Sequence, residues 1–417
     1  MALSAPTKNW IPSSFEMPRS PPNVHSCRSL IFHLALSKAV DIPFNRPWIA
    51  GPEFEYIGRA IAAGHLSGGG PFTRRCQAWL EERIGCRRAL LATSCTAALE
   101  MSALLADIKP GDEIIMPSYT FVTTATAFVL RGGVPVFVDI RPDTLNIDER
   151  SIENAISPRT RVIVAVHYAG VGCEMAEILG IAERYGLTVI EDAAQGLLAS
   201  CRTRPLGSLG HMAAVSFHET KNVMCGEGGA LLVNAPALTA RAEVIWEKGT
   251  NRRAFLEGLT DKYTWVDLGS SFYPSEISAA FLWAQLEHAD AATAERLRVW
   301  NRYHEAFAKL EEAGRVRRPI VPQDCVHNAH MYYLLLAEAE HRAVVLRQLN
   351  ATGINAVFHY VPLHLSPAGR VFGRTRGPLP VTEALAARLI RLPMWIGLDE
   401  DQIDRVVLSV SKTVERL

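Results

Sequence analysis

The sequence has no excess of charge of either sign and no long apolar run. Among its 417 residues, Lys plus Arg and Asp plus Glu number 43 each. A protein that binds nucleic acid through phosphates needs a basic surface, so this balance argues against nucleic acid as a partner. No stretch reaches the length of about 20 apolar residues that a membrane-spanning helix needs. We therefore expect a cytoplasmic protein that neither spans a membrane nor binds nucleic acid.

The cysteines form no recognisable pattern. The sequence contains no CxxC pair and no cysteine spacing to histidine that is typical of a metal site. The eight cysteines are scattered: Cys27, Cys76, Cys86, Cys95, Cys173, Cys201, Cys225 and Cys325. This usage is typical of unpaired thiols in a reducing compartment, and it predicts neither a disulfide framework nor a bound metal.

The composition and the periodicity of apolar residues divide the chain into three parts. Residues 1–41 are rich in Pro and Ser and lack a helical or strand period, which predicts a disordered or loosely attached extension. From Ile42 onward helical and strand patterns alternate, which indicates an α/β protein with a mainly parallel sheet. We expect a large α/β domain over residues 42–290 and a smaller α+β domain over residues 291–417.

The expected elements follow from the apolar patterns. Strands are expected at residues 113–116, 134–139, 161–166, 188–190, 212–216, 230–233, 331–336 and 356–360. Helices are expected at residues 96–105, 123–130, 236–248, 276–288 and 291–312. Open α/β sheets bind ligands at the carboxyl ends of their strands, so the chemistry is expected just after these runs.

One lysine stands in a suggestive setting. Lys221 follows an apolar strand pattern that ends in Ser216 and Phe217, and a glycine-rich turn at residues 226–229 comes next. Burial favours the neutral, nucleophilic form of a lysine, which can form a Schiff base. An isolated lysine of this kind is more often a surface residue, so its neighbours decide between the two interpretations.

Asp192 and Gln195 follow a neighbouring strand in the segment VIEDAAQG. A strand-end aspartate can keep the pyridine nitrogen of pyridoxal phosphate protonated, which that cofactor needs in order to act as an electron sink. It can equally cap a helix. Gln195 could donate a hydrogen bond to the phenolic oxygen of the same cofactor. Together with Lys221, Asp192 predicts a pyridoxal phosphate site.

Five further positions are compatible with such a site. Cys95 and Thr96 begin a helix, and a helix amino terminus binds phosphate, although a plain helix cap is commoner. Ser216 could supply another hydroxyl to the phosphate. Phe121 could stack on the pyridine ring or pack in the core. His167, just past a strand, is either a substrate contact or a buried structural histidine.

From about Ile42 to the carboxyl end, the sequence resembles the DegT/StrS-type sugar-nucleotide aminotransferases. The matching segments occur in the family's order: FTRRCQAWLEERIG, SCTAALEMSALL, PGDEIIMPSYTFVTTATAFVLRGG, RPDTLNIDE, TRVIVAVHYAGVGCEM, VIEDAAQG, SFHETKN, GEGGALL, EKGTNRRAF, DKYTWVDLGSSF, NAHMYYLLL and AVFHYVPLH. The resemblance implies fold type I of the pyridoxal phosphate enzymes, the aspartate aminotransferase-like fold.

The resemblance also implies a role for each site residue. Lys221 becomes the Schiff-base lysine and proton carrier, Asp192 the partner of the pyridine nitrogen, and Gln195 the partner of the phenolic oxygen. The implied phosphate and ring contacts are Cys95, Thr96, Ser216 and Phe121. Asn251, in GTNRR, resembles an asparagine that reaches the neighbouring subunit's phosphate, which implies a homodimer with shared active sites.

The implied reaction is a transamination with L-glutamate as the amino donor and dTDP-4-dehydro-6-deoxy-D-glucose as the acceptor. His330, His359 and Tyr360 lie in matching segments and are candidates for contacts with the sugar or nucleotide. Alternatives are a transaminase for another nucleotide-linked 4-keto or 3-keto sugar, and a non-catalytic sugar-nucleotide-binding protein of the same fold. The dehydratases of the family carry histidine in place of Lys221, so the lysine argues against that activity.

Overall fold

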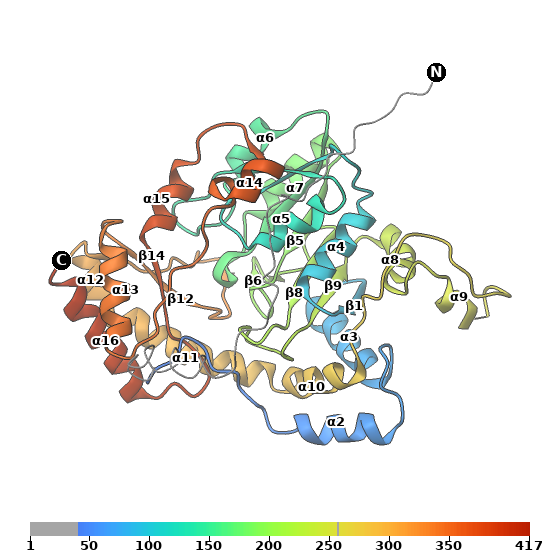
Figure 1. The fold of residues 1–417 in the computed structure, drawn as a ribbon, viewed down its shortest axis with the longest axis horizontal. Coiled ribbons are helices and arrows are strands. Elements are labelled where there is room, and N and C mark those ends of the chain that lie inside the picture. The colour runs from blue at the N-terminus through green and yellow to red at the C-terminus, as the bar shows by residue number, and fades with distance from the viewer. Residues whose placement is uncertain (1–40, 257) are drawn as a thin grey trace, which may run out of the picture. The chain divides into compact units, whose positions relative to one another are not determined.

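The computed structural model describes residues 41–256 and 258–417 (Figure 1). Residues 41–417 form one compact unit. The predicted amino-terminal extension, residues 1–41, lies outside the described residues apart from Asp41. Within the described part of the chain, no helix combines the length and the apolar character that crossing a membrane requires.

The centre of the unit is an eight-stranded sheet in the order β1-β9-β8-β5-β4-β2-β3-β13. Its strands are β1 (Arg88–Ala92), β2 (Glu113–Pro117), β3 (Val134–Val138), β4 (Thr160–Val166), β5 (Thr188–Asp192), β8 (Met212–Ser216), β9 (Gly229–Val233) and β13 (Arg374–Thr375). All neighbouring strands from β8 to β13 pair in parallel, whereas β9 pairs antiparallel with both β1 and β8. The predicted α/β fold with a mainly parallel sheet is confirmed.

Helices bury both faces of this sheet, which explains its continuous apolar strands. Every residue of β2, β8 and β9 is buried. Along β2, Ile114 and Met116 pack on one face and Ile115 on the other, as strand alternation requires. The first face is covered by α4 (Cys95–Leu105), α5 (Val122–Val129) and α8 (Thr239–Trp246). The second is covered by α3 (Pro71–Ile84), α6 (Ile152–Ala155), α7 (Met175–Tyr185) and α10 (Glu276–Glu287).

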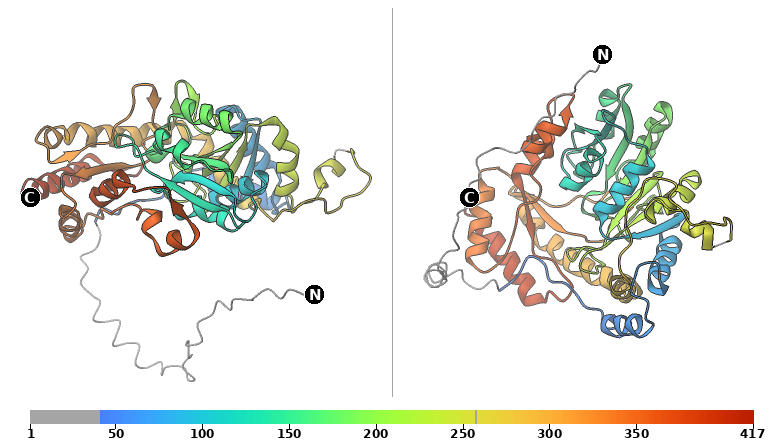
Figure 2. Two further views of the ribbon diagram at one scale, coloured as in Figure 1. Left: turned by 90° about the horizontal axis from the view of Figure 1, so that it is seen from above. Right: turned by 45° about the vertical axis from the view of Figure 1, so that its right-hand side comes forward.

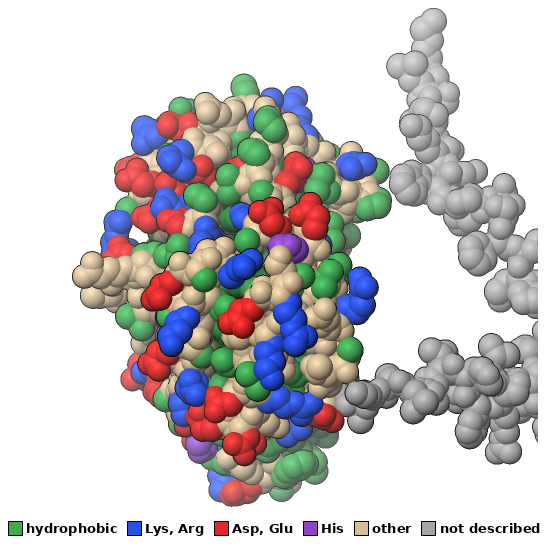
Figure 3. Space-filling model, turned by 90° about the vertical axis from the view of Figure 1, so that its left-hand side faces the viewer, with side chains coloured by type: hydrophobic (Ala, Val, Ile, Leu, Met, Phe, Trp, Pro, Cys, Tyr) green, Lys and Arg blue, Asp and Glu red, His purple; other side chains and the backbone are tan. Residues whose placement is uncertain are grey.

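The carboxyl-terminal part packs around a smaller antiparallel sheet, β10-β12-β14, with its own apolar core. Its elements are α11 (Ala289–Ala306), α12 (Ala308–Glu312), β10 (Val316–Arg317), β12 (Tyr332–Leu336), α13 (His341–Ala351), α14 (Pro367–Phe372), α15 (Pro380–Arg388), β14 (Leu389–Leu392) and α16 (Glu400–Val414). Positive and negative side chains are interspersed on the face that this part presents in Figure 3.

The sequence predicts a large domain that ends at residue 290 and a small domain that begins at residue 291. Two strands from the second of these parts pair with strands from the first. β13 adds to the edge of the large sheet beside β3, and β11 (Cys325–Val326) pairs with β6 (Ser200–Cys201), which also pairs with β7 (Arg204–Pro205). Because residues 41–417 form one compact unit, the boundary between a large and a small domain stays a prediction.

Two expected elements differ from the structure. Residues 356–360 do not form a strand, because only Val357 pairs with the neighbouring chain, in a single bridge to Arg391. The long helix expected over residues 291–312 is divided into α11 and α12 at Phe307. The ψ angle of Phe307 is 4°, far from the value of about −42° in an α-helix, so the helix is interrupted there.

The seven cysteines in the described residues are free, in line with the sequence prediction. The structure nevertheless places Cys201 and Cys325 opposite each other on β6 and β11, with their Sγ atoms 2.9 Å apart. The two residues are 124 positions apart, and no spacing rule predicts a contact between cysteines at that separation.

A projecting segment, here called the α9 arm, comprises residues 249–256 and 258–268 and contains α9 (Arg252–Leu256). Figures 1 and 2 show α9 extending away from the sheet, whereas α2 (Glu53–Ala62) lies beside α10. The arm is pinned at its base by the bridge between Thr250 and Trp265. It exposes large apolar side chains: Phe255, Leu256, Leu259, Tyr263, Trp265, Val266 and Leu268. Such a concentration is typical of an interaction surface.

Candidate active site

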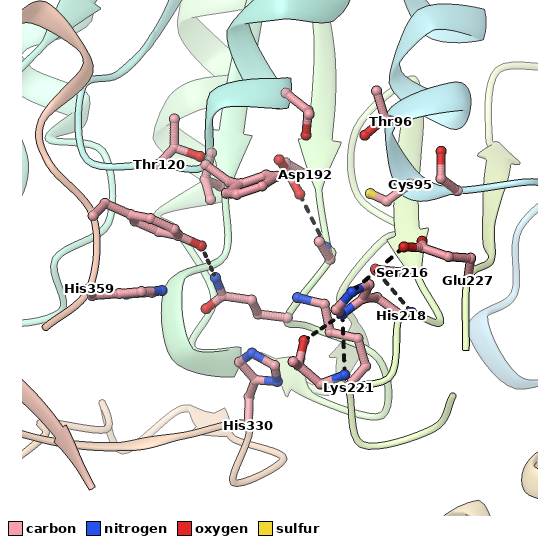
Figure 4. Close-up of a pocket in the computed structure, with 18 of the residues that line it drawn as sticks. Cys95, Thr96, Thr120, Asp192, Ser216, His218, Lys221, Glu227, His330 and His359 are labelled. Atoms are coloured by element: carbon pink, nitrogen blue, oxygen red, sulfur yellow. Dashed lines mark hydrogen bonds and ion pairs between the residues drawn. The ribbon is translucent and has the colours of Figure 1, made fainter. Parts of the chain in front are cut away.

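A cavity of about 510 Å³ opens at the carboxyl ends of β4, β5 and β8 (Figure 4). Val166, Asp192 and Ser216, the last residues of these strands, all line it. Most of the predicted site residues meet there: Cys95, Thr96, Phe121, Asp192, Gln195, Ser216, Lys221, His330, His359 and Tyr360. The position matches the rule that open α/β sheets bind ligands at their carboxyl edge.

Lys221 reaches the cavity from a turn just after β8. Its backbone N–H donates to the carbonyl of His218 at 2.9 Å, which fixes the turn. Burial lowers the pKa of Lys221 from its ordinary 10.5 to about 8, although the neighbouring Cys95 and Asp192 act in the opposite direction. At neutral pH a larger share of this amine is therefore uncharged and nucleophilic than for an exposed lysine.

Asp192 is held firmly at the end of β5. Its carboxylate is buried, accepts a hydrogen bond from the hydroxyl of Thr124 at 2.7 Å, and accepts another from the backbone N–H of Ala194 at 3.2 Å. A turn, not a helix, follows this residue, so Asp192 does not serve as a helix cap. Its carboxylate faces the same cavity as Lys221 (Figure 4).

The amide side chain of Gln195 is fixed by two partners. Its Oε1 accepts from the backbone N–H of Ala169 at 2.7 Å, and its Nε2 donates to the hydroxyl of Tyr360 at 3.0 Å. Gln195 is among the residues that line the cavity, so its side-chain amide borders the space where a ligand binds. The second hydrogen of that group remains available for a ligand oxygen.

The start of α4 forms one end of the cavity. Ser94 caps the helix, because its Oγ accepts from the N–H of Ala97 at 3.1 Å, while Cys95 and Thr96 line the cavity. The first N–H groups of a helix lack partners within the helix, and with the helix dipole they favour an anion. Gly229 explains the glycine turn: a Cβ there would lie 2.4 Å from the backbone N of Cys95, so only glycine lets β9 approach.

Phe121 and Tyr360 form an aromatic wall. Phe121 is 54% exposed and lines the cavity, so it is not a core residue. The centres of the two rings lie 6.2 Å apart. Phe121 is therefore free to stack on a planar ligand.

His167 lies outside the cavity, and the structure favours the structural alternative for this residue. It is fully buried; its Nε2 contacts a Glu191 carboxylate oxygen at 2.8 Å, and its Nδ1 accepts from the N–H of Cys173 at 3.2 Å. Both ring nitrogens are thus occupied within the protein. The expectation of a substrate contact by His167 is corrected accordingly.

Asn251 lies in the α9 arm and not in the cavity of its own chain. Its Oδ1 accepts from the N–H of Thr264 at 2.7 Å, and its Nδ2 donates to the carbonyl of Lys262 at 3.1 Å. These bonds hold the arm in shape. A contact between Asn251 and a phosphate requires a second subunit, so it stays a prediction.

His330 and His359 line the cavity on the carboxyl-terminal side (Figure 4). Burial, together with nearby cations, lowers the pKa of both imidazoles well below the ordinary value, so both are neutral at pH 7. The Nδ1 of His359 lies 2.7 Å from the hydroxyl of Tyr168, and its ring stacks on Tyr360 at 3.6 Å between ring centres.

The sequence prediction missed several cavity residues, of which Arg391 is the most prominent. Others are Phe44, Thr120, Thr123, His218, Thr220 and Glu227. Arg391 did carry a signal, because it interrupts the apolar strand LIRL in which a charge is unexpected. Of the remaining residues, Thr123 lies in the first turn of α5 and the others lie outside helices and strands, where the sequence shows no comparable break in pattern.

Comparison with known proteins identifies the chain. A model of the DegT/DnrJ/EryC1/StrS aminotransferase family matches residues 48–411. An uncharacterised protein of Methanocaldococcus jannaschii is 33% identical over 380 residues, covering 89% of this chain and 97% of its own. The spore coat polysaccharide biosynthesis protein SpsC of Bacillus subtilis is 30% identical over 382 residues, covering 90% and 97%.

Comparison with solved structures supports the same family. A DegT/DnrJ/EryC1/StrS aminotransferase from Brucella abortus superposes with a TM-score of 0.79 at 31% identity, over 86% of this chain and 94% of that one. Fold and site together define an aminotransferase of fold type I. The chain belongs to the DegT/DnrJ/EryC1/StrS aminotransferase family.

As an aminotransferase of this family, the protein uses pyridoxal phosphate as its cofactor. The residues present fit this group, because one cavity combines a lysine of lowered pKa, a buried carboxylate and the amino terminus of an eleven-residue helix. Ser94, Cys95 and Thr96 at that helix start and Ser216 at the end of β8 line the same cavity, so free N–H groups and hydroxyls are available there for a phosphate. The individual contacts of these residues with the cofactor stay proposals.

Proposed function

We propose that the protein is a sugar-nucleotide aminotransferase that transfers the amine of L-glutamate to dTDP-4-dehydro-6-deoxy-D-glucose. The products are dTDP-4-amino-4,6-dideoxy-D-galactose and 2-oxoglutarate, as for the transaminase of enterobacterial common antigen synthesis. The observation that carries the proposal is the presence of Lys221 and Asp192 in one cavity at the carboxyl edge of the sheet. The name of the Bacillus relative, a polysaccharide biosynthesis protein, supports a sugar substrate.

In this proposal the cavity residues bind the cofactor at four places. Cys95, Thr96 and Ser216 hold the phosphate, Asp192 pairs with the pyridine nitrogen, and Phe121 covers one face of the ring. Gln195, with its amide fixed by Ala169 and Tyr360, donates to the phenolic oxygen. When bound, pyridoxal phosphate supplies the electron sink that makes proton removal from the amine-bearing carbon feasible.

Lys221 moves the protons. Its amine takes the proton from the α carbon of L-glutamate and later delivers a proton to C4 of the sugar. The face from which Lys221 delivers this proton sets the galacto configuration. The lowered pKa of Lys221, about 8, places its proton affinity near physiological pH, where general acid and base catalysis is most efficient.

Turnover of a panel of nucleotide ketosugars tests this function. The protein is incubated with pyridoxal phosphate, L-glutamate and either dTDP- or UDP-linked 4-keto and 3-keto sugars, and products are identified by mass and NMR coupling constants. We expect amination of the dTDP-linked 4-keto sugar with the galacto configuration. Amination of only other ketosugars would refute this substrate while supporting another transaminase of the family. No amination of any ketosugar would favour the non-catalytic alternative.

We further propose a homodimer in which each subunit's Asn251 completes the phosphate site of its partner. The α9 arm supports this arrangement, because it projects from the subunit and exposes apolar side chains such as Trp265, which is 76% exposed. Obligate dimers bury apolar surface of this kind. The polar atoms of Asn251 lie on the same arm.

Heterodimers test the shared site. Lys221→Ala and Asn251→Ala chains are co-expressed with different tags, and the mixed dimer is purified through both. Each homodimer is expected to be strongly impaired, whereas the mixed dimer keeps one intact site and about half of the wild-type turnover. An inactive mixed dimer would place Asn251 at its own subunit's site, and a fully active Asn251→Ala homodimer would remove it from the site.

A further inference from the structure

Cys201 and Cys325 are direct partners in the antiparallel pairing of β6 with β11, and their Sγ atoms lie 2.9 Å apart. The pairing continues beyond them, because the N–H of Arg202 donates to the carbonyl of Asp324 at 2.7 Å. This bond shows that the two cysteines form a non-hydrogen-bonded pair of the ladder, the kind of pair at which side chains approach each other most closely. Both the backbone and the side chains therefore bring the two thiols together.

The two thiols differ in their access to solvent. Cys201 is partly exposed, whereas Cys325 is buried. Burial raises the pKa of the Cys325 thiol to about 12, and the neighbouring Cys201 acts in the same direction. A small thiol reagent in solution therefore reaches Cys201 first, and Cys325 stands directly behind it as a second thiol.

A shared metal ion fits this pair poorly. In the described part of the chain, the one further ligand beside the two sulfurs is Asp324, whose Oδ2 accepts from the Nε of Arg202 at 2.9 Å. Two thiolates bound to one tetrahedral zinc ion at the usual Zn–S distance lie about 3.8 Å apart. The sulfurs of Cys201 and Cys325 are closer than this, so the arrangement favours a bond between them over a shared metal.

We propose that Cys201 and Cys325 are a redox-active thiol pair, which forms a reversible disulfide by exchange with a low-molecular-weight disulfide such as oxidised glutathione. The Cys201 thiolate attacks one glutathione sulfur, the glutathione S–S bond breaks, and the first glutathione thiolate leaves. Cys325 then gives its proton to water, and its sulfur attacks the sulfur of Cys201, which releases the second glutathione thiolate. Each released thiolate takes up a proton. Two protein thiols are thus oxidised and one glutathione disulfide is reduced. None of these steps depends on the proposed function.

The disulfide would join two segments that lead to the active-site cavity. β6 follows Gln195 and β11 precedes His330 in the chain. Asn328 already links these segments, because its Nδ2 donates to the carbonyls of Gln195 and Leu197, each at 2.8 Å. The bond needs no rearrangement of the fold, since the thiols are already in contact. It should therefore stabilise the folded protein, because a cross-link between residues 124 positions apart restricts the unfolded chain.

Peptide mapping in glutathione buffers tests the proposal. The full-length protein loaded with pyridoxal phosphate is equilibrated with oxidised or reduced glutathione, remaining thiols are blocked with N-ethylmaleimide, and the digest is analysed by mass spectrometry. In oxidised glutathione we expect a cross-linked peptide that joins Cys201 to Cys325 and the loss of two free thiols per chain. Excess reduced glutathione should restore both thiols. No cross-link, glutathione retained on Cys201, or a cross-link to another cysteine would overturn the proposal.

Serine variants separate this pair from the other thiols. Cys201→Ser should lose the cross-link, whereas the control Cys86→Ser, which removes a buried cysteine outside the pair, should keep it. The melting temperature of the wild type should be several degrees higher in oxidised than in reduced glutathione, and that of Cys201→Ser should be the same in both. Equal melting temperatures for the cross-linked and reduced wild type would overturn the stabilising effect. Stoichiometric zinc that is lost in Cys201→Ser would identify a metal site instead and would overturn the thiol pair.

Discussion

Replacing Lys221 with alanine should abolish practical transaminase turnover. The variant loses the covalent anchor of the cofactor and also the group that transfers protons in both halves of the reaction. A positioned acid or base alone contributes about 10²–10⁴-fold to the rate, so the total loss should reach or exceed this range. Initial rates of 2-oxoglutarate formation with L-glutamate and the dTDP-linked ketosugar measure the effect.

Lys309→Ala is the matched control for this prediction. Lys309 is an exposed lysine of α12, outside the cavity, and its removal should leave the rate unchanged. Both variants should keep the wild-type melting temperature within a few degrees, since neither lysine holds the core together. Wild-type turnover in Lys221→Ala would contradict the assignment of the anchor.

Replacing Asp192 with asparagine should reduce the turnover number by about 10²–10³-fold, the usual cost of removing one electrostatic contact at a reacting group. Asparagine keeps the size of the side chain and can still accept from Thr124, but it no longer carries the charge that holds a proton on the pyridine nitrogen. The cofactor should still attach to Lys221, so the loss appears in the rate and not in cofactor content. Steady-state kinetics together with cofactor absorbance measure both quantities.

Asp139 offers a control for Asp192, because it also follows a strand of the central sheet. Its carboxylate accepts from the N–H and the hydroxyl of Thr382 at 2.7 and 2.6 Å, and it does not line the cavity. Asp139→Asn should therefore lower the melting temperature and leave the turnover number unchanged. A turnover number of Asp192→Asn within a few-fold of wild type would remove Asp192 from the proposed site.

The sheet was predictable because its strands are buried on both faces and read as unbroken apolar runs. The runs at β2, β8 and β9 were located to within one residue. The segment at residues 356–360 has a similar apolar content, yet only Val357 finds a pairing partner. The two-residue strand β13 has no apolar run at all, so only the tertiary structure places it beside β3.

The contrast between Glu191 and Asp192 shows the limit of sequence reasoning at the site. Adjacent residues of a strand point to opposite faces, so Asp192 reaches the cavity while Glu191 accepts hydrogen bonds from Gly207, Leu209 and Gly210 and pairs with His167. The sequence shows that both carboxylates and His167 lie at strand ends, but it does not show which of these side chains faces the cavity. Arg391 was not predicted as a cavity residue for a different reason. The cavity is built from parts of the chain that are distant in sequence, from Phe44 to Arg391 in β14, and only the fold brings them together.

Locating the covalent anchor tests the central claim most directly. The wild-type protein is loaded with pyridoxal phosphate, reduced with borohydride and digested, and the modified peptide is identified by mass spectrometry. The account predicts one modified residue, Lys221, with attachment that increases as the pH rises through about 8, where its amine becomes neutral. A reduced adduct on another lysine, or no adduct at any pH between 7 and 9, would contradict it.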